Sequence, residues 1–232
     1  MKFTFTKEVL LKEMAIAQEI ISNKTAISIL SNVLLIAKEG SLTIRATDIK
    51  VAFETKIPVD VAEEGATTVF CDKFTSIIAS MPSGEIEAEQ KDQKLIIRSI
   101  SKKAKFSLKT ISDNDFPPFT DSSNVQFFEV PAKEFKEMIT QTIFAVSDDE
   151  TRYFMNGVYM EKKENNLIFA ATDGRRLAFI QHDFGIALPD FKGSIIPPKI
   201  LSIVQRRSSE EGMISIGISE KNIFFNFNIL LF

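Results

Sequence analysis

The sequence has very few of the residues that most often carry chemistry. Its 232 residues include one cysteine, one histidine and no tryptophan. A lone cysteine excludes a disulfide framework within the chain and is compatible with a reducing cytosol. Because Cys71 follows Val69 and Phe70, we expect a buried structural thiol. No set of cysteines and histidines has the spacing of a metal site, so the sequence predicts neither a metal nor a cofactor.

Catalytic motifs are also missing. The chain has no phosphate-binding glycine loop of the Walker type and no Gly-x-Ser-x-Gly sequence. His182 lies beside Asp183 in a predicted strand, which favours a surface position over a role as a general base. Asp48 and Asp173 each follow a predicted strand, and turn formation accounts for both. We therefore expect no catalytic residue and a protein that is not an enzyme.

Charge and hydropathy exclude further classes of protein. The net charge of -3 gives no overall attraction to nucleic acid or to an anionic membrane, so any such binding must come from a local patch. The chain opens Met-Lys-Phe-Thr-Phe and soon reaches Glu8, which is not typical of a signal or transit peptide. No apolar run approaches membrane-spanning length. The composition predicts a soluble, cytoplasmic protein.

The strongest positive feature is an internal repeat with a period of about 124 residues. Lys12-Glu13-Met14 returns as Lys136-Glu137-Met138, and Ala46-Thr47-Asp48 returns as Ala171-Thr172-Asp173. The hydrophobic content of 44% is sufficient for two cores. The repeat therefore predicts two duplicated domains, and repeated domains usually build curved or closed assemblies rather than a catalytic cleft.

Hydrophobic periodicity predicts helices separated by antiparallel strands. The predicted helices are Lys7–Ile21, Asp72–Met81 with Asp72 as its cap, Ala132–Val146 and Pro198–Arg207. Strands are predicted at 2–5, 32–37, 41–47, 51–59, 67–70, 85–90, 94–99, 104–110, 126–130, 153–161, 166–171, 176–182, 194–196, 213–218 and 222–227. Strands in tight succession with helices on one face indicate an α+β fold.

A stretch without periodicity separates the two repeats. Residues 113–124 combine prolines, acids and serines, which is typical of an extended connector, so we expect domains at 1–112 and 125–232. The second repeat lacks a counterpart of the strand at 104–110, and the sequence closes on apolar residues 229–232. This pattern predicts that the second domain is incomplete and that the chain is truncated.

Several motifs in order along the chain resemble the bacterial sliding clamp family, the beta subunits of DNA polymerase III. The matching segments are Met1–Thr4, Gly65–Val69, Phe106–Leu108, Asp115–Pro117, Arg152–Gly157 and Ala171–Ala178. The resemblance implies duplicated clamp domains with antiparallel sheets outside and two helices per domain lining a hole for DNA. In this family three domains form a subunit, and two subunits join head to tail into a ring. We therefore expect this chain to contain the first two domains and to lack the third.

The resemblance also implies a function and a set of partners. The expected function is that of a processivity factor that encircles duplex DNA and tethers the replicative polymerase during chromosomal replication. The expected partners are double-stranded DNA without sequence preference, a second copy of the subunit, the polymerase alpha subunit, the clamp loader and other proteins with a clamp-binding motif. No membrane partner is expected.

Three groups of site residues follow from the same resemblance. DNA contacts are expected at Lys24, Tyr153, Lys199 and Arg206. A groove for partner peptides is expected at Met155, Thr172, Gly174, Arg175, Arg176 and Leu177. The subunit interface is expected at Lys73, Lys103, Lys105, Phe106 and Leu108, on an edge strand with exposed Phe106 and Leu108.

Each group has a structural alternative. Asp173-Gly174 alone is typical of a hairpin turn, and Leu177 alone is typical of a core residue. Strand alternation also permits Phe106 and Leu108 to point inward. The acids at 148–150 weaken the neighbouring DNA contact or hold that loop away from phosphates. For the whole chain, the alternatives are a fragment that cannot close a ring and acts as a docking module, or an enzyme whose 173–176 loop binds phosphate.

Overall fold

The computed structural model describes residues 1–21 and 27–227. It divides into two compact units, Met1–Phe119 (unit 1) and Thr120–Phe232 (unit 2), with the division inside the predicted connector. Lys24 and residues 228–232, which include the apolar stretch 229–232, lie outside the described residues. Among the residues described, no helix is long and apolar enough to cross a membrane.

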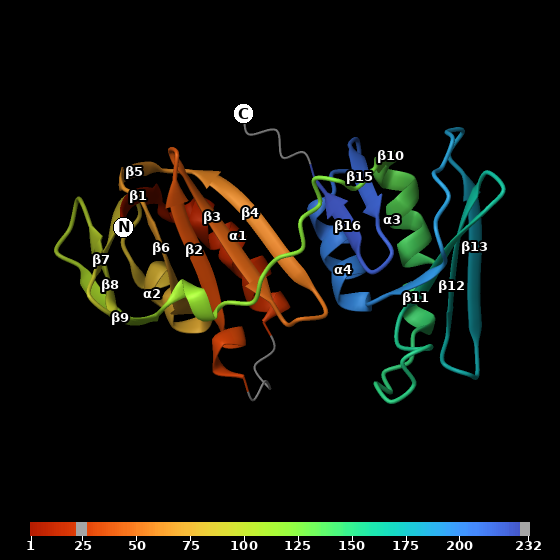
Figure 1. Cartoon of the computed structure of the whole chain (residues 1–232), viewed down its shortest axis with the longest axis horizontal. Helices are drawn as coiled ribbons and strands as arrows, with labels where there is room; N and C mark the ends of the chain where they lie inside the picture. Colours follow the sequence, from red (N-terminus) through yellow and green to blue (C-terminus); the bar gives the residue numbers. More distant parts are fainter. Residues whose placement is uncertain (22–26, 228–232) are drawn as a thin grey trace. The chain divides into compact units, whose positions relative to one another are not determined.

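Unit 1 is built around one antiparallel sheet (Figure 1). Its helices are α1 (Lys7–Ile20), α2 (Cys71–Ser80) and the short 3-10 turns η1 (Ser28–Ser31) and η2 (Asp113–Asp115). Its strands are β1 (Lys2–Thr6), β2 (Asn32–Lys38), β3 (Ser41–Thr47), β4 (Ala52–Pro58), β5 (Asp60–Glu63), β6 (Gly65–Phe70), β7 (Glu85–Lys91), β8 (Lys94–Ser99) and β9 (Lys105–Ile111). The strand order is β4-β3-β2-β6-β9-β8-β7-β1-β5, in which β9 joins two groups of four strands.

The two helices of unit 1 pack against each other in opposite directions. Lys7 at the start of α1 donates a hydrogen bond to the carbonyl of Ala79 near the end of α2, at 2.8 Å. Gln18 near the end of α1 donates to Asp72 in the first turn of α2, also at 2.8 Å. Asp72 is therefore not the cap that the sequence predicted. The N-cap position belongs to Phe70, which has no side-chain cap, and Asp72 joins the helices instead.

The core of unit 1 follows the alternation of its strands. Leu35, Ile44 and Ile97 point to the helix side of the sheet and are fully buried, as are Leu10 and Met14 of α1. Burial of apolar side chains supplies most of the favourable free energy of such a fold. Cys71 is fully buried, as the sequence predicted, and desolvation raises the pKa of its thiol to about 12.

Unit 2 has two separate sheets in its described part. Its helices are α3 (Ala132–Thr140), α4 (Pro198–Arg207) and the turn η3 (Ile143–Ala145). Its strands are β10 (Phe127–Pro131), β11 (Val158–Lys163), β12 (Asn166–Thr172), β13 (Leu177–Asp183), β14 (Ser194–Ile196), β15 (Met213–Ile218) and β16 (Ile223–Asn226). The sheet orders are β13-β12-β11-β14 and β10-β15-β16.

Strand register confirms that the units repeat one design. In unit 1, Arg45 lies opposite Leu34 on one side and Glu54 on the other. In unit 2, Ala170 lies in the same way between Tyr159 and Phe179. The sheet β13-β12-β11-β14 thus corresponds to β4-β3-β2-β6, and both units have the predicted α+β architecture with antiparallel sheets. Within residues 120–227, no strand corresponds to β9.

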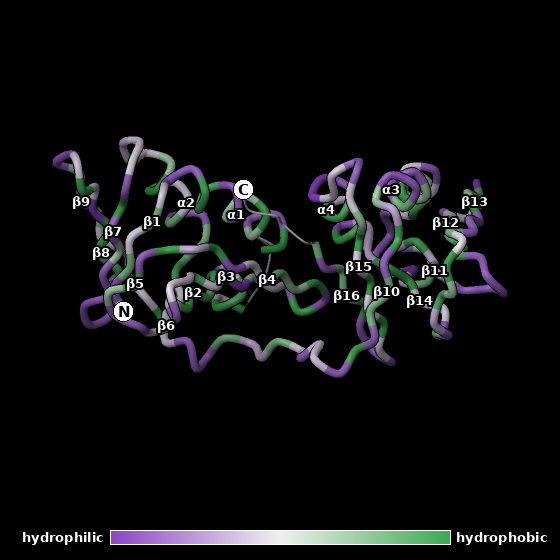
Figure 2. Tube along the Cα trace, turned by 90° about the horizontal axis from the view of Figure 1, so that it is seen from above, coloured by the Kyte–Doolittle hydropathy of each residue, from purple (hydrophilic) through white to green (hydrophobic). Residues whose placement is uncertain are grey.

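The core of unit 2 lies between its helices and sheets. Phe135 of α3 meets Phe169 of β12 edge to face, with ring centroids 5.4 Å apart, and both side chains are fully buried. Hydrophobic residues follow the strands and helices, whereas many of the connecting loops are hydrophilic (Figure 2). The edge-to-face geometry adds to the stabilisation that burial of the two rings provides.

Two elements of unit 2 differ from the prediction. The helix predicted to reach Val146 ends at Thr140, because the chain turns at Thr142, whose buried hydroxyl donates back to the carbonyl of Met138 at 2.7 Å. The strand predicted from Tyr153 begins only at Val158. Residues 152–156 form a turn closed by hydrogen bonds from the amides of 155 and 156 to one carbonyl, that of residue 152. In unit 1, the sequence reading missed the short strand β5.

Candidate functional site

The turn between β12 and β13 is held by its own side chains. The hydroxyl of Thr172 donates to the carbonyl of Arg176 at 2.7 Å and accepts from the amide of Gly174 at 3.0 Å. One carboxylate oxygen of Asp173 accepts from the amides of Arg175 and Arg176, at 2.9 and 3.1 Å. These amides are occupied within the loop, which argues against the alternative that the loop binds phosphate.

Gly174 brings this turn against the loop that precedes β11. Its φ of +89° lies in the left-handed region, which favours glycine. A methyl group built on Gly174 would be 3.9 Å from the Sδ and Cε atoms of Met155 and 3.8 Å from Nη1 of Arg152. The structure therefore places Met155 beside Gly174.

Exposed apolar side chains adjoin the turn. Leu177 is 71% exposed, so it is not the core residue that the alternative reading required. The Arg176 guanidinium lies 5.5 Å from the ring centroid of Phe144, which is itself 57% exposed. Sequence reasoning missed Phe144 because it placed this residue inside a longer helix. An aliphatic surface edged by arginines suits an apolar peptide with polar ends.

The electrostatics of the turn keep Asp173 ionised. Hydrogen bonds from the amides of Arg175 and Arg176 lower the pKa of its carboxyl, and the guanidinium of Arg176 adds to this effect. Nε of Arg176 contacts the second carboxylate oxygen at 3.0 Å. This contact orients the side chain of Arg176, and both Arg175 and Arg176 are exposed.

The loop before β11 carries two exposed rings. Tyr153 is 77% exposed and meets Phe154 edge to face at 5.5 Å. Within the acidic run at 148–150, Asp149 accepts hydrogen bonds from the hydroxyl and amide of Thr151 and forms an ion pair with Arg152 at 3.3 Å. These bonds, that of the hydroxyl first, lower the pKa of the Asp149 carboxyl. One of the three acids therefore shapes the loop that presents Tyr153.

Helix α4 presents the predicted cations of unit 2. Lys199 in its first turn is partly exposed, and Arg206 in its last turn is exposed. Arg206 and Arg207 both lie at the C-terminal end, where positive charge interacts favourably with the helix dipole. Gln205 donates to the hydroxyl of Thr140 at 2.6 Å, which holds α4 against α3. The fourth predicted DNA contact, Lys24, lies outside the described residues.

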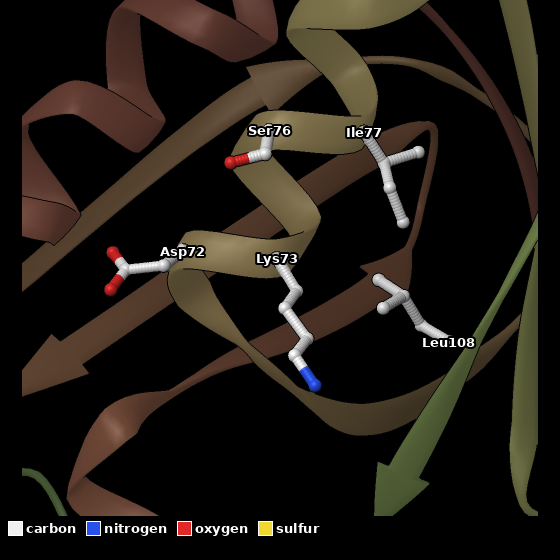
Figure 3. Close-up of a pocket in the computed structure, with 5 residues that line it drawn as sticks. All are labelled: Asp72, Lys73, Ser76, Ile77 and Leu108. Atoms are coloured by element: carbon white, nitrogen blue, oxygen red, sulfur yellow. The ribbon is translucent and has the colours of Figure 1, made fainter.

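Two of the predicted interface residues line a shallow cavity in unit 1. The cavity has a volume of about 300 Å³ and is lined by Asp72, Lys73, Ser76, Ile77 and Leu108. In Figure 3 the side chains of Ile77 on α2 and Leu108 on β9 point toward each other, with Lys73 alongside. Lys73 also lies 5.9 Å from the ring of Phe70.

The burial of Leu108 contradicts the sequence prediction that this side chain is exposed. It is only 7% exposed and packs inward opposite Leu95, whereas Phe106 on the same strand is 40% exposed. Lys103 and Lys105 are exposed. Over residues 105–109 the described ladder of β9 is to β8 alone, and β9 reaches β6 only through Thr110 and Ile111. This part of β9 is therefore a strand edge within the described structure.

Within residues 1–21 and 27–227, no group of acidic, histidine or cysteine side chains is arranged to hold a metal ion. His182 is half-exposed and contacts Glu134 at 3.1 Å through Nε2, and its ring meets that of Phe184 at 4.5 Å. This histidine therefore links β13 to α3 at the surface.

The described geometry defines a class of protein: a duplicated α+β module with antiparallel sheets and two α-helices in each described unit. Comparison with known proteins narrows this class to one family. Residues 1–120 match the N-terminal domain of the DNA polymerase III beta subunit, and residues 129–232 match its central domain. The chain therefore belongs to the beta sliding clamp family, the DNA polymerase III beta subunits.

Individual relatives agree with this assignment. The chain is 45% identical to the beta sliding clamp of Treponema pallidum over 98% of its own length and 61% of the relative's. Among solved structures, the DNA polymerase III beta subunit of Pseudomonas aeruginosa is 30% identical, with a TM-score of 0.89 over 98% of this chain and 62% of that one. The sliding clamp of Bacillus subtilis is 27% identical, with a TM-score of 0.90. The chain thus spans about 61% of the length of its curated relatives.

Proposed function

We propose that the chain acts in a DNA sliding clamp, a non-catalytic processivity factor that encircles duplex DNA and tethers the replicative polymerase to its template. The observation that carries the proposal is the match of two successive units to the N-terminal and central domains of the family, in the family's order. A ring holds DNA by topology, so the proposed role requires no catalytic group, metal or cofactor. The proposed location is the cytoplasm.

The proposed DNA contacts are Lys199 and Arg206 on α4, Tyr153 on the loop before β11, and Lys24. Cations spread over a helix contact phosphates, position the protein and read no sequence, which suits a protein that must slide. The overall net charge of -3 is consistent with weak contacts of this kind, because tight phosphate binding would impede sliding.

The proposed partner site is the surface formed by Met155, Thr172, Gly174, Arg175, Arg176 and Leu177. Its support is the proximity of Met155 to Gly174 and the 71% exposure of Leu177. The partners we propose are the polymerase alpha subunit, the clamp loader and other proteins that carry the clamp-binding motif. Their apolar side chains would contact Met155 and Leu177, with the two arginines at the rim.

The proposed subunit contact lies on the edge of β9. Lys103, Lys105 and Phe106 are exposed there, Lys73 lies beside the neighbouring cavity, and Leu108 supports the strand from within. An unpaired strand edge with flanking lysines suits strand-to-strand pairing with a second clamp subunit, where charge sets the register. This contact would form the head-to-tail ring.

A second candidate function follows from the length of the match. The chain spans 61% of its curated relatives and matches two domain models of the family. A protein with these two units alone would offer the partner surface without closing a ring of the family's kind. It would then act as a docking module that binds clamp partners away from DNA.

Retention on circular DNA separates the two candidates. The chain is mixed with nicked circular DNA, the complex is isolated by gel filtration, and the DNA is then linearised. A ring stays on the circle and is lost after linearisation, and light scattering gives a defined oligomer of the 26.1 kDa chain. Equal loss from both forms, with a monomer in solution, would support the docking module and contradict encirclement.

A further inference from the structure

Three lysines lie side by side on the solvent face of β7, β8 and β9, which are neighbouring strands of unit 1 (Figure 1). Lys94 of β8 lies directly opposite Lys91 of β7 and directly opposite Lys109 of β9. All three residues are exposed, and together they form the lysine row. Side chains directly opposite one another in antiparallel strands are about 5 Å apart at Cβ, so like charges there destabilise the sheet. A bound anion would offset this repulsion.

The cations next to the lysine row extend its positive surface. Arg98 of β8 lies opposite Lys105 of β9 on the same face, and both residues are exposed. Glu87 of β7 forms ion pairs with Arg98 and, at 3.2 Å, with Lys2 of β1. Because the whole chain has a net charge of -3, attraction to an anion depends on such a local concentration of positive charge.

The carboxylates closest to the lysine row do not neutralise it. Glu89 is paired with Lys91 at 3.1 Å. The hydrogen bond from Lys91 first, and the charges of two further cations, lower the pKa of the Glu89 carboxyl. Asp92 is exposed in the turn between β7 and β8. Among the residues that the structure describes, Lys94 and Lys109 form no ion pair, so both are available to an anion.

Protection of a sheet edge explains only part of this arrangement. Lysines on an edge strand prevent pairing with other chains, and this role suits Lys105 and Lys109 on β9. Lys94 is different, because β8 is paired on both sides, with β7 and with β9. Lys91 is also away from the edge, because β7 pairs with β1 and β8. The row therefore continues further into the sheet than edge protection requires.

Unit 2 shows that the fold does not require the lysines. Its strands β15 and β16 correspond to β7 and β8, and Ser219 and Asn222 flank the turn where Lys91 and Lys94 flank it in unit 1. The amide of Ser219 donates to the carbonyl of Asn222 at 2.9 Å, and the hydroxyl of Ser219 accepts from the amide of Asn222 at 3.1 Å. Neutral polar residues close the same hairpin, so the lysine row is a property of the unit 1 surface.

We propose that the lysine row binds the phosphates of a duplex DNA segment, as a second DNA contact in addition to the cations of α4. Lysine ammonium groups are point charges on flexible stems, which suit phosphate contacts without sequence preference. The row covers two strand spacings, about 10 Å, which is the axial length of about three nucleotides of one DNA strand.

The composition of the face favours duplex over single-stranded DNA. Ile96 and Ser107 lie between the lysine row and the Arg98–Lys105 pair, and Phe106 points to the opposite side of β9. Within the described strands β7, β8 and β9, the solvent face thus carries no aromatic ring. Proteins hold single strands largely by stacking bases on such rings, whereas duplex DNA needs only contacts to its backbone.

The test measures binding of the full chain to a short linear duplex by fluorescence anisotropy over a range of salt concentrations. A ring slides off linear DNA, so phosphate contacts rather than encirclement dominate this measurement. One variant combines Lys91→Ser, Lys94→Asn and Lys109→Ser, which gives the row neutral polar residues. We expect binding about tenfold weaker at low salt and a slope of log K against log salt smaller by about 2 to 3.

A matched control removes three exposed lysines that lie outside the row, by Lys38→Ser, Lys56→Asn and Lys163→Ser. It loses the same charge and should keep the slope of the unchanged chain. Thermal unfolding of the same samples checks the fold, and removal of the opposed lysines should leave the melting temperature unchanged or higher. Should the row variant fail to fold, Lys94→Gln removes the central charge alone and should lower the slope by about 1.

Isotope-labelled methyl groups on the lysine amines locate the contact by NMR, because methylation keeps the positive charge. Addition of the duplex should shift the signals of Lys94 and Lys109 saturably and leave that of Lys56 in place. An unlabelled single strand should compete less well than the unlabelled duplex, because the face offers no ring for stacking.

Four results would overturn the proposal. The first is an equal reduction of the slope by the matched control, and the second is the absence of shifts at Lys94 and Lys109. The third is stronger competition by the single strand. The fourth is a concentration-dependent shift of these signals without DNA, which would show that a second copy of the chain covers the row. Retention on circular DNA is measured separately, so failure of the lysine row and failure of encirclement are distinguishable.

Discussion

Thr47 and Thr172 hold equivalent turns in the two units by the same pair of hydrogen bonds. Each hydroxyl donates to the carbonyl four residues later, at 3.0 Å for Thr47 and 2.7 Å for Thr172. Each also accepts from the amide two residues later, at 3.0 Å in both units. The turn that carries the proposed partner groove in unit 2 is therefore a general feature of the repeat, and side chains around it give each copy its own surface.

The third residue of this turn differs between the units, and this difference predicts opposite effects on stability. Ile49 has a φ of +78° and Gly174 a φ of +89°. A β-branched residue is strained there, whereas glycine is not. We expect Ile49→Gly to stabilise unit 1 by about 1 kcal/mol and Gly174→Ala to destabilise unit 2 by a similar amount. Urea unfolding of each variant measures both effects.

A matched control is Gly40→Ala, at a φ of +68° in open space, which should cost about as much as Gly174→Ala. If Ile49→Gly lowers stability, the 68% exposed side chain of Ile49 contributes more than its backbone strain costs, and the argument from strain is wrong.

Two residues of strand β9 should differ in their contribution to stability, because one is buried and the other lies at the surface. Leu108 is buried against α2 and Leu95, so Leu108→Ala should destabilise the protein by about 2 kcal/mol or more. Phe106 is 40% exposed, and Phe106→Ala should cost less than about 1 kcal/mol. Thermal unfolding distinguishes the two. A large loss for Phe106→Ala would place this ring in the core and remove it from the proposed subunit contact.

The repeat made most of the fold predictable, because alternation and turn residues determine strands locally. The helix Pro198–Arg207 and the strand Ser41–Thr47 agree with the structure at both ends. Errors arose where tertiary contacts outweigh local pattern. Asp72 has the residue type of a cap but bonds to Gln18 of the other helix, and the apolar run from Tyr153 folds into a turn closed by its backbone.

The candidate site was predictable only in part. Gly174 and Leu177 were accessible to sequence reasoning because the motif Ala171–Ala178 resembles a known family. The exposed positions of Phe144 and Phe179 were not predictable, because exposure of an apolar residue depends on which neighbours cover it. Leu34 and Tyr159 occupy equivalent positions, yet only the first is covered.

Lowering the pH should reduce the stabilising effect of the Asp173 carboxylate on its turn. The amides of Arg175 and Arg176 lower the pKa of this carboxyl, so its stabilising effect is complete above the unfolded pKa of about 3.9 and is lost as pH falls through the folded pKa. Asp173→Asn should therefore reduce stability at pH 7 and have less effect near pH 3. Urea unfolding at both pH values checks this. An equal effect at both would show that the ionised form has no advantage.

Binding of a clamp-motif peptide should depend on Met155 and Leu177 without a matching loss of stability. Leu177 is 71% exposed, so Leu177→Ala should change the free energy of unfolding by less than about 0.5 kcal/mol while weakening peptide binding. Met155→Ala removes the thioether beside Gly174 and should weaken binding similarly. Fluorescence anisotropy and thermal unfolding are measured on the same samples, with Ile100→Ala as the control. A large fall in melting temperature would identify these residues as core and remove them from the groove.

The positively charged side chains of α4 should contribute to the salt dependence of DNA binding. Each phosphate contact releases condensed counterions, so Lys199→Ala and Arg206→Ala should each lower the slope of log K against log salt by about 1, without altering preference among sequences. Lys163, exposed at the end of β11, is a matched control, and Lys163→Ala should leave the slope unchanged. The comparison isolates the effect of position, because each of the three variants loses one positive charge. An equal reduction by Lys163→Ala would mean that total charge, rather than the placement of cations on α4, governs the interaction.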